Sequence, residues 1–231
     1  MKAILLAAGL GTRLRPVTNT TPKCLVPIHG KPLLGYWLDL LLQSGTTDQV
    51  LINTHYLPDA VRQYVAASPW NAAVRLVHED TLLGTGGTVL QNRGFLGDQA
   101  FMLVHADNLT RFDPAAFIAA HTNRPAGTEL TMMTFDTDAP QTCGIVELDA
   151  RGVVQAFHEK QPNPPGRRAN AAVYIFEPSV VDYIVSLNRE VCDISTEVLP
   201  HFLGRMNTFH NADYHRDIGN LESLALAERE Y

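Results

Sequence analysis

The N-terminal stretch constrains the fold more than any other part of the chain. Residues 2–6 (KAILL) form a short apolar run, which is typical of a strand buried on both faces of a parallel sheet. The run ends in AAGLGTR, residues 7–13, where two alanines and two glycines leave backbone N–H groups open. Because no bulky side chain blocks the approach, such a turn can hold a phosphate group closely. The stretch therefore predicts an α/β fold that binds a phosphorylated ligand.

Two cations follow the turn, Arg13 at its end and Lys23 beyond a Pro-containing segment. A phosphate-binding turn with two cations suits a polyphosphate ligand. The Walker A motif is excluded because no Gly-Lys-Ser/Thr follows the first glycine. The dinucleotide fingerprint is also excluded, because Leu14 stands where a third glycine is needed and no acidic residue follows at the ribose position. A nicotinamide oxidoreductase is therefore disfavoured. Gly-x-Gly alone is equally compatible with a bare turn between a strand and a loop.

A longer pattern surrounds these glycines and cations. It comprises Gly9-x-Gly11-Thr12-Arg13, Pro16, Pro22-Lys23, Leu25-Val26-Pro27 and Gly30-Lys31-Pro32. This pattern resembles the signature of the sugar-1-phosphate nucleotidylyltransferases, also called nucleotide-sugar pyrophosphorylases. Within that family the chain looks most like the mannose-1-phosphate and D-glycero-D-manno-heptose-1-phosphate guanylyltransferases. The resemblance implies an α/β nucleotide-diphospho-sugar transferase fold: a Rossmann-like, mostly parallel mixed sheet sandwiched by helices, with a small β-rich sugar-binding subregion.

Composition limits the other possibilities. A chain of 231 residues is long enough for one α/β domain, and we expect one over 1–231, with a nucleotide-binding half (1–125) and a sugar-binding half (126–231). The formal net charge of −6 argues against binding to nucleic acid or to a membrane surface. No apolar run is long enough for a membrane span or a signal peptide, so we expect a cytoplasmic protein. The three cysteines lack metal-site spacing and are expected to be reduced thiols. A homodimer is compatible with the apolar helix faces.

Apolar runs and turn residues predict the order of elements. Strands are expected at 2–6, 49–53, 74–78 and 100–104, and helices at 32–45, 58–67, 85–93 and 114–120. Beyond them, strands are expected at 129–135, 144–148, 153–158 and 169–176, a helix at 178–187, a last strand at 206–210 and a C-terminal helix from 217 to 230. Residues 193–197 (DISTE) indicate a capping box in which Ser195 or Thr196 begins a helix to about Leu203.

A second glycine-rich segment comprises Gly84, Thr85, Gly86 and Gly87. Its exposed backbone is a candidate wall for a nucleobase, although a plain glycine-rich loop would have the same composition. The string Leu-Gly-Thr-Gly-Gly resembles the base-recognition loop of the family. Together with the Asp193 segment, it favours guanine as the base and a manno-configured sugar.

Two carboxylates are candidate metal ligands. Asp107 follows an apolar strand, and ligands bind at the carboxyl ends of the strands in open α/β sheets. Asp217 lies in an Asp-Ile-Gly sequence that alone could simply be the acidic start of a helix. The resemblance implies that both carboxylates bind Mg²⁺. His105 is expected to be a packing or hydrogen-bonding residue.

Three segments of the second half resemble sugar-binding motifs of the family. Gly144 lies in Cys-Gly-Ile-Val, where the family has Tyr-Gly-Val-Val, and Glu159 and Lys160 resemble a Glu-Lys-Pro motif. Asn170 begins Asn-Ala-Ala-Val-Tyr, with alanine where glycine is common. That departure leaves the identity of the sugar open. Without the resemblance, Glu159 and Lys160 would be compatible with a solvated charge pair.

The resemblance implies Mg²⁺-dependent transfer of a nucleotidyl group from a nucleoside triphosphate, with GTP favoured, to a sugar 1-phosphate of the mannose or manno-heptose type. The catalytic residues implied are Arg13, Lys23 and Lys160. The nucleotide-binding residues implied are Ala7, Ala8, Gly9, Gly11, Thr12, Arg13, Lys23, Gly84, Thr85, Gly86, Gly87 and Asp107. The sugar contacts implied are Gly144, Glu159, Lys160 and Asn170. The alternatives are UTP or dTTP with another sugar 1-phosphate, such as that of glucose or N-acetylmuramic acid, and a non-catalytic nucleotide-sugar sensor.

Overall fold

The computed structural model describes all residues, 1–231, and divides into two compact units. Unit 1 comprises Met1–Leu82, Val104–Pro114 and Asp213–Tyr231. Unit 2 comprises Leu83–Leu103 and Ala115–Ala212. The strand β6 (Phe101–His105) contributes residues to both units. Unit 1 therefore contains the beginning, a middle segment and the end of the chain.

Parallel strands form the centre of unit 1. The order is β1 (Lys2–Leu6), β4 (Gln49–Thr54) and β5 (Val74–His78), and β1 and β4 align Leu6 with Asn53. The middle residues of β1 and nearly all of β4 are buried, as their apolar sequences predict. Two helices of unit 1, α1 (Leu33–Gln43) and α2 (Pro58–Ala67), follow β3 and β4 in the chain and are confirmed near the predicted positions.

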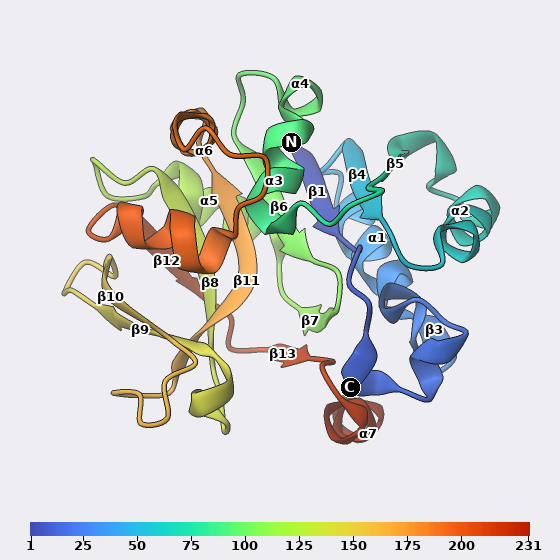
Figure 1. Ribbon diagram of the computed structural model, residues 1–231. Helices are drawn as coiled ribbons and strands as arrows, with labels where there is room; N and C mark the ends of the chain where they lie inside the picture. The colour runs from blue at the N-terminus through green and yellow to red at the C-terminus, as the bar shows by residue number, and fades with distance from the viewer. The chain divides into compact units, whose positions relative to one another are not determined.

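Short antiparallel strands complete unit 1. One pair is β2 (Pro27–Ile28) with β3 (Lys31–Pro32), and the other is β7 (Asn108–Arg111) with β13 (Tyr214–Asp217). The prediction that 206–210 is the last strand was wrong, because β13 follows it. The C-terminal helix α7 spans Leu221–Glu230, next to the label C in Figure 1, and begins later than predicted. Its capping box joins Asn220 to Ser223, so residue 217 remains in a strand.

An apolar cluster, here called the anchor cluster, lies among the loops of unit 1. Its members are buried side chains from six segments: Leu14, Val26, Ile28, Leu33, Leu109, Ile218 and Ala227. Burying an aliphatic side chain of this size stabilises a protein by roughly 1.5–3 kcal/mol. The loops that carry the polar residues of unit 1 are therefore fixed by apolar packing.

Unit 2 contains a mainly antiparallel group of strands in the order β10-β9-β11-β8-β12. The strands are β8 (Leu130–Asp136), β9 (Gly144–Leu148), β10 (Val154–Glu159), β11 (Arg168–Phe176) and β12 (Met206–His210). Only the pair β12–β8 is parallel. The strand β11 bulges between Asn170 and Tyr174, and Ala172 within the bulge has a φ of +53°. The β-rich second half is thereby confirmed.

The helices of unit 2 include α3 (Gly84–Gln91), α4 (Arg93–Leu96), α5 (Pro114–Thr122) and α6 (Pro178–Ser186). The predicted helix from 195 to about 203 was wrong. A π-helical turn (Ile194–Val198) and a 3-10 turn (Leu199–Phe202) replace it. Pro200 has no N–H to continue an α-helix, which explains the break. The cap is Asp193, whose carboxylate accepts from Thr196 N at 3.0 Å, and Glu197 accepts from Asp193 N at 2.8 Å.

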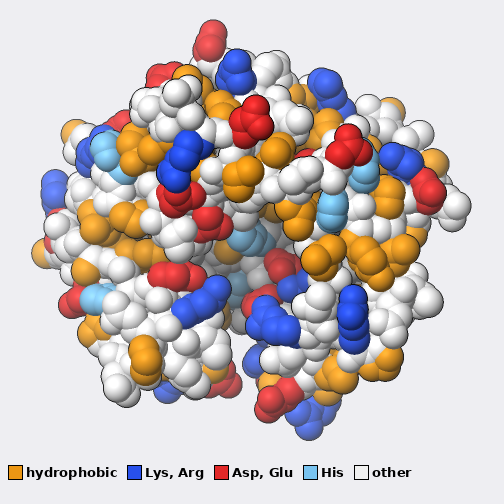
Figure 2. Space-filling view, in the orientation of Figure 1, with side chains coloured by type: hydrophobic (Ala, Val, Ile, Leu, Met, Phe, Trp, Pro, Cys, Tyr) orange, Lys and Arg blue, Asp and Glu red, His pale blue; other side chains and the backbone are white.

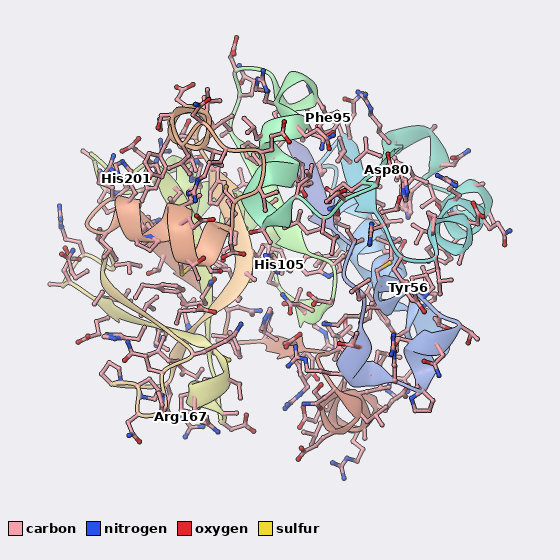
Figure 3. All side chains as sticks on the ribbon, in the orientation of Figure 1. Tyr56, Asp80, Phe95, His105, Arg167 and His201 are labelled. Atoms are coloured by element: carbon pink, nitrogen blue, oxygen red, sulfur yellow. The ribbon has the colours of Figure 1, made fainter.

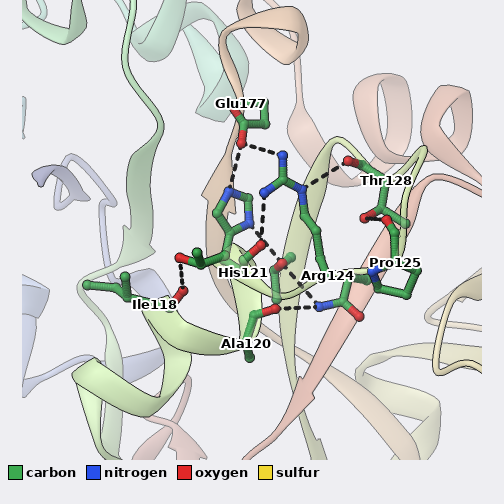
Figure 4. Close-up of polar contacts among 10 residues, drawn as sticks. Ile118, Ala120, His121, Arg124, Pro125, Thr128 and Glu177 are labelled. Carbon is green, nitrogen blue, oxygen red and sulfur yellow. Dashed lines mark hydrogen bonds and ion pairs between the residues drawn. The ribbon is translucent and has the colours of Figure 1, made fainter.

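A buried polar network fixes the end of α5 in unit 2 (Figure 4). His121 lies 2.9 Å from Thr131 Oγ1 through Nδ1 and 3.2 Å from Glu177 Oε1 through Nε2. Arg124 donates to the same carboxylate oxygen at 2.5 Å and to the carbonyl oxygen of Thr128 at 3.0 Å. Burial and the charge of Arg124 lower the pKa of His121, although Glu177 acts in the opposite direction. The imidazole is therefore held neutral at pH 7.

The surface carries acidic and basic side chains interspersed over the face shown in Figure 2. None of the helices is both long enough and apolar enough to cross a lipid bilayer.

Candidate functional site

The phosphate-binding turn predicted from the sequence follows β1 in unit 1. Gly11 has a φ of +64°, and a Cβ atom there would lie 2.9 Å from Thr18 Cγ2. The hydroxyl of Thr18 donates to the carbonyl oxygen of Gly11 at 2.7 Å, and Ala7 N donates to Asn53 Oδ1 at 2.7 Å. A Cβ at Gly9 would meet nothing within 4 Å. The turn is thus fixed at both ends and open to a ligand at its middle.

Lys23 joins two carboxylates of unit 1. Its Nζ contacts Asp107 Oδ2 and lies 3.6 Å from Asp217 Oδ1, and its side chain is only 10% exposed. The two aspartates come from segments far apart in the sequence. Because β7 and β13 pair with Asp217 opposite Asn108, they bring Asp217 next to Asp107. Strand pairing therefore creates a site with one ammonium group between two carboxylates.

Arg13 extends this charged group. A Cβ atom on Gly219 would lie 2.7 Å from Asp217 Oδ2 and 3.3 Å from Arg13 Nη2. Gly219 therefore lies close to both the carboxylate and the guanidinium. Arg13, Lys23, Asp107 and Asp217 are brought together as one charged cluster.

The two carboxylates differ in their affinity for protons. Burial alone would raise the pKa of Asp107, but the charges of Lys23 and His105 and the hydrogen bond from Lys23 lower it. Loss of hydration and the negative charge of Asp107 raise the pKa of Asp217, against the effects of Lys23 and Arg13. Asp107 is therefore the firmly ionised member of the pair. Asp217 gains most from an additional cation nearby.

The glycine-rich segment of unit 2 packs closely against residues 190–194. A Cβ atom added to Gly86 would overlap Cys192 Sγ, and one added to Gly87 would overlap the Glu190 carbonyl oxygen. The N–H groups of Gly86 and Gly87 donate to Cys192 O at 2.9 and 3.3 Å. The hydroxyl of Thr85 donates to Asp193 Oδ2 at 3.1 Å and accepts from Ile194 N at 2.7 Å. These contacts explain the glycines by packing. Recognition of a base by this segment stays a prediction.

Gly144, Glu159 and Lys160 are brought together at one end of β9 and β10 in unit 2. The register aligns Glu159 with Gly144, and a Cβ on Gly144 would lie 2.5 Å from the ring of Phe157 and 2.7 Å from Glu159 Oε2. Lys160 N donates to Cys143 O at 3.1 Å, and its Nζ lies 3.2 Å from Glu159 Oε1. The Lys160 side chain is 67% exposed, so its ammonium group is accessible to a ligand.

Asn170 builds the bulge of β11 instead of standing free. Its Nδ2 donates to Tyr174 Oη at 2.7 Å, and its Oδ1 accepts from Ala172 N at 2.9 Å. Burial raises the pKa of Tyr174, the hydrogen bonds from Asn170 and Ser195 lower it, and the charges of Glu159 and Asp193 raise it. Asn170 therefore orients the buried Tyr174 hydroxyl.

Comparison with known proteins identifies the family. The sequence profile described as "Nucleotidyl transferase" matches residues 2–231. The chain belongs to the nucleotidyl transferase family. This confirms the resemblance found in the sequence.

Relatives of this chain differ in the substrates that their names give. The mannose-1-phosphate guanylyltransferase of Mycobacterium tuberculosis is 32% identical over 227 residues, covering 96% of the chain and 62% of the relative. The UTP–glucose-1-phosphate uridylyltransferase of Synechocystis is 29% identical, covering 96% of the chain and 61% of the relative. The crystal structure of HddC from Yersinia pseudotuberculosis complexed with GMP-PN has a TM-score of 0.80 at 26% identity, covering 99% of the chain and 98% of HddC. The chain spans about three-fifths of the length of the Mycobacterium tuberculosis and Synechocystis relatives.

The structural likeness confirms the predicted fold class. The chain has the α/β architecture of its structural neighbours, with parallel strands in unit 1 and mainly antiparallel strands in unit 2.

The donor set of the charged cluster suits a hard divalent cation. No group of three or more His, Cys, Asp or Glu side chains lies close enough together to hold a metal ion. Asp107 and Asp217 would supply two carboxylates, and Mg²⁺ is commonly held by one or two carboxylates together with substrate phosphates and water. The mutual repulsion that raises the pKa of Asp217 would be relieved by such a cation. The residues therefore fit Mg²⁺ bound together with a polyphosphate substrate.

Several residues that lie next to the predicted site residues were not singled out in the sequence. They are Gly219, which lies against Asp217 and Arg13, Cys192, which packs on Gly86, and Tyr174, which accepts a hydrogen bond from Asn170. The Asp-Ile-Gly string was the available signal for Gly219. Nothing in the local sequence marks Cys192 as the partner of the glycines.

Proposed function

We propose that the protein is a Mg²⁺-dependent sugar-1-phosphate nucleotidylyltransferase. The observation that carries the proposal is the charged cluster of unit 1, in which Lys23 lies between Asp107 and Asp217 beside Arg13. This cluster stands at the phosphate-binding turn that follows β1. Family membership supports the same chemistry.

In this reaction an oxygen of the sugar 1-phosphate attacks the α-phosphorus of the nucleoside triphosphate. The bond from the α-phosphorus to the bridging oxygen breaks, and pyrophosphate leaves with that oxygen. Asp107 and Asp217 would hold Mg²⁺, which supplies charge neutralisation and alignment of the phosphates when bound. The chain needs no covalent nucleophile, because positioning and charge stabilisation are sufficient.

The protein's own groups have separate roles in this proposal. The turn from Gly9 to Thr12 would hold the phosphates through its N–H groups, and Arg13 would bind the β- and γ-phosphate oxygens. Lys23 would meet the α-phosphate and its leaving oxygen. Lys160 would hold the attacking sugar phosphate, and Glu159 would contact sugar hydroxyls. Asn170 would act through the bulge of β11, since both ends of its amide are bonded within the protein.

We propose GTP and a manno-configured sugar 1-phosphate as the substrates. The 32% identity to the mannose-1-phosphate guanylyltransferase and the similarity to HddC, whose structure contains GMP-PN, support this pairing. The uridylyltransferase of Synechocystis at 29% identity supports UTP and glucose 1-phosphate as the second pairing.

The test is pyrophosphate release by the full chain with Mg²⁺. Five triphosphates (ATP, GTP, CTP, UTP and dTTP) are each paired with the 1-phosphates of mannose, glycero-manno-heptose, glucose and N-acetylmuramic acid. We expect release confined to GTP with mannose or heptose 1-phosphate. Release with UTP or dTTP would retain the chemistry and overturn the choice of base. Triphosphate binding without release from any pair would overturn the enzyme assignment in favour of a sensor.

A further inference from the structure

A pocket in unit 2 is lined by residues that were given no role above. It has a volume of about 630 Å³ and is lined by Asp136, Leu148, Arg167 and Arg168. Figure 3 labels Arg167 at the lower edge of unit 2, beside the loop that leads into β11. This size is within the range of about 300–1,000 Å³ that is typical of small-molecule sites. The pocket therefore has room for a small metabolite.

Both arginines of the pocket are anchored through one nitrogen only. Arg167 Nε donates to Thr137 O at 2.7 Å, and Arg168 Nε donates to Asp136 Oδ1 at 3.1 Å. The Thr137 N–H also donates to Arg167 O at 3.0 Å, so that the backbone is tied at the same point. Neither pair of Nη nitrogens makes a hydrogen bond within the chain. Two guanidinium groups are thus oriented by the protein while their terminal donors stay available.

The strand register also contributes to this orientation. Arg168 is opposite Asp136 in the β11–β8 register, which fixes the base of its side chain. A site with pre-oriented donors loses little conformational entropy when it binds.

We propose that this pocket is a second anion site that binds the phosphate group of a small metabolite. Paired guanidinium forks match the oxygen geometry of phosphate, and Asp136 neutralises only one of the two positive charges. Leu148 gives the pocket an apolar wall against which the carbon skeleton of a phosphate ester can lie. The ligand is either free phosphate or a phosphomonoester of sugar size. None of the pocket residues is assigned to the proposed transfer reaction.

The test is calorimetric titration of the full chain in chloride buffer with inorganic phosphate and with glucose 6-phosphate. Glucose 6-phosphate has no phosphate at its anomeric carbon, so it cannot be a sugar 1-phosphate substrate. We expect both to bind, and we expect the double variant R167Q/R168Q to weaken binding at least tenfold. R151Q is the matched control, because Arg151 is an exposed arginine of the same unit that pairs with Asp149 and does not line the pocket. Its affinity should stay within twofold of the wild-type value.

A background variant separates this pocket from the phosphate-binding turn. In R13Q the pocket should still titrate, and adding R167Q/R168Q should remove that signal. Loss of binding in R13Q alone, or equal binding in wild type and R167Q/R168Q, overturns the proposal.

If the double variant does not fold, the single variants R167K and R168K keep the positive charge but lack the planar guanidinium. Each should then weaken binding at least threefold, and unchanged binding would also overturn the proposal. Tighter binding of glucose 6-phosphate than of phosphate identifies an ester as the ligand, and equal binding identifies free phosphate.

Discussion

The main-chain N–H of Ile218 donates a hydrogen bond of 3.0 Å to the carbonyl oxygen of Asp107. This bond extends the pairing of β7 and β13 by one step beyond Asp217 and Asn108. The spacing of the two carboxylates is therefore set by backbone pairing, and not only by the side chains that meet there. In the proposed reaction, a site held in this way would be arranged for a cation and a polyphosphate before either binds.

Lys23 and Arg13 should differ in their effect on stability. Both Lys23→Ala and Arg13→Ala should lower the rate of pyrophosphate release about 100- to 1,000-fold, since each removes a charge near the phosphates. Lys23→Ala should also cost about 1–3 kcal/mol of stability, because the carboxylate of Asp107 loses its buried partner. Arg13→Ala should leave the Tm nearly unchanged because Arg13 is exposed. Denaturant unfolding measures the stability of each variant, and steady-state kinetics measures its rate of pyrophosphate release. Arg62→Ala is the control, because it also removes an exposed arginine. Unchanged stability of Lys23→Ala would contradict the prediction.

Gly219→Ala should impair activity more than stability. The new Cβ would lie 2.7 Å from Asp217 Oδ2 and 3.3 Å from Arg13 Nη2, so both groups must shift. We expect kcat/KM to fall about 10- to 100-fold, as a displacement of about 1 Å can cost 100-fold. Gly94→Ala in α4 is the control, since its Cβ meets nothing within 4 Å. Equal kcat/KM values for the two variants would show that the approach at Gly219 is not critical.

Gly86 and Cys192 should show coupled effects on stability. A Cβ on Gly86 would overlap Cys192 Sγ, so Gly86→Ala should destabilise the protein by about 1–3 kcal/mol. In a Cys192→Ala background the same substitution should cost much less, because the sulfur is absent. A double-mutant cycle from denaturant unfolding measures the coupling, which we expect to be about 1 kcal/mol or more. Additive effects would refute the packing explanation for this glycine.

The His121 network should make stability depend on pH. The pKa of His121 is lower in the folded chain than its ordinary value of about 6.5, so the unfolded chain binds more protons between those two pKa values. Stability should therefore fall as the pH decreases through about 6.5, until the pH reaches the folded-state pKa. Thermal unfolding of wild type and His121→Gln at pH 7.5 and 5.5 checks this. The variant should lose less stability than wild type on acidification.

The sequence was most informative where a single segment contains the whole signal. Three such features were predicted near their observed positions: the apolar run of β1, the turn at Gly11, and the helix α1, whose ends were predicted from Pro32 and Gly45. Each depends only on residues that are neighbours in the sequence. Arg13, Lys23, Asp107 and Asp217 were also singled out from motifs, and the structure brings them together. Their roles in binding and catalysis stay predictions.

Features that depend on distant partners were not predictable. The strands β7 and β13 are four residues each, mix polar with apolar residues, and acquire their conformation only by pairing with one another. The helix expected after Asp193 became a π-helical turn, since Pro200 and the contact with Thr85 dominate over local propensity. The close packing of Gly86 on Cys192 likewise has no local signature.

The anchor cluster makes the charged site a single cooperative unit. Leu14 directly follows Arg13, Ile218 directly follows Asp217, and Leu109 lies two positions beyond Asp107, so that one apolar cluster holds the backbone of three charged residues. Val26 does the same for the segment of Lys23. Local opening of such a cluster would release all four charged residues in one event, because none of them has separate apolar support there. Heating should therefore switch the site off as a whole, and hydrogen exchange should give one common free energy of opening for the amides near Leu14, Leu109 and Ile218.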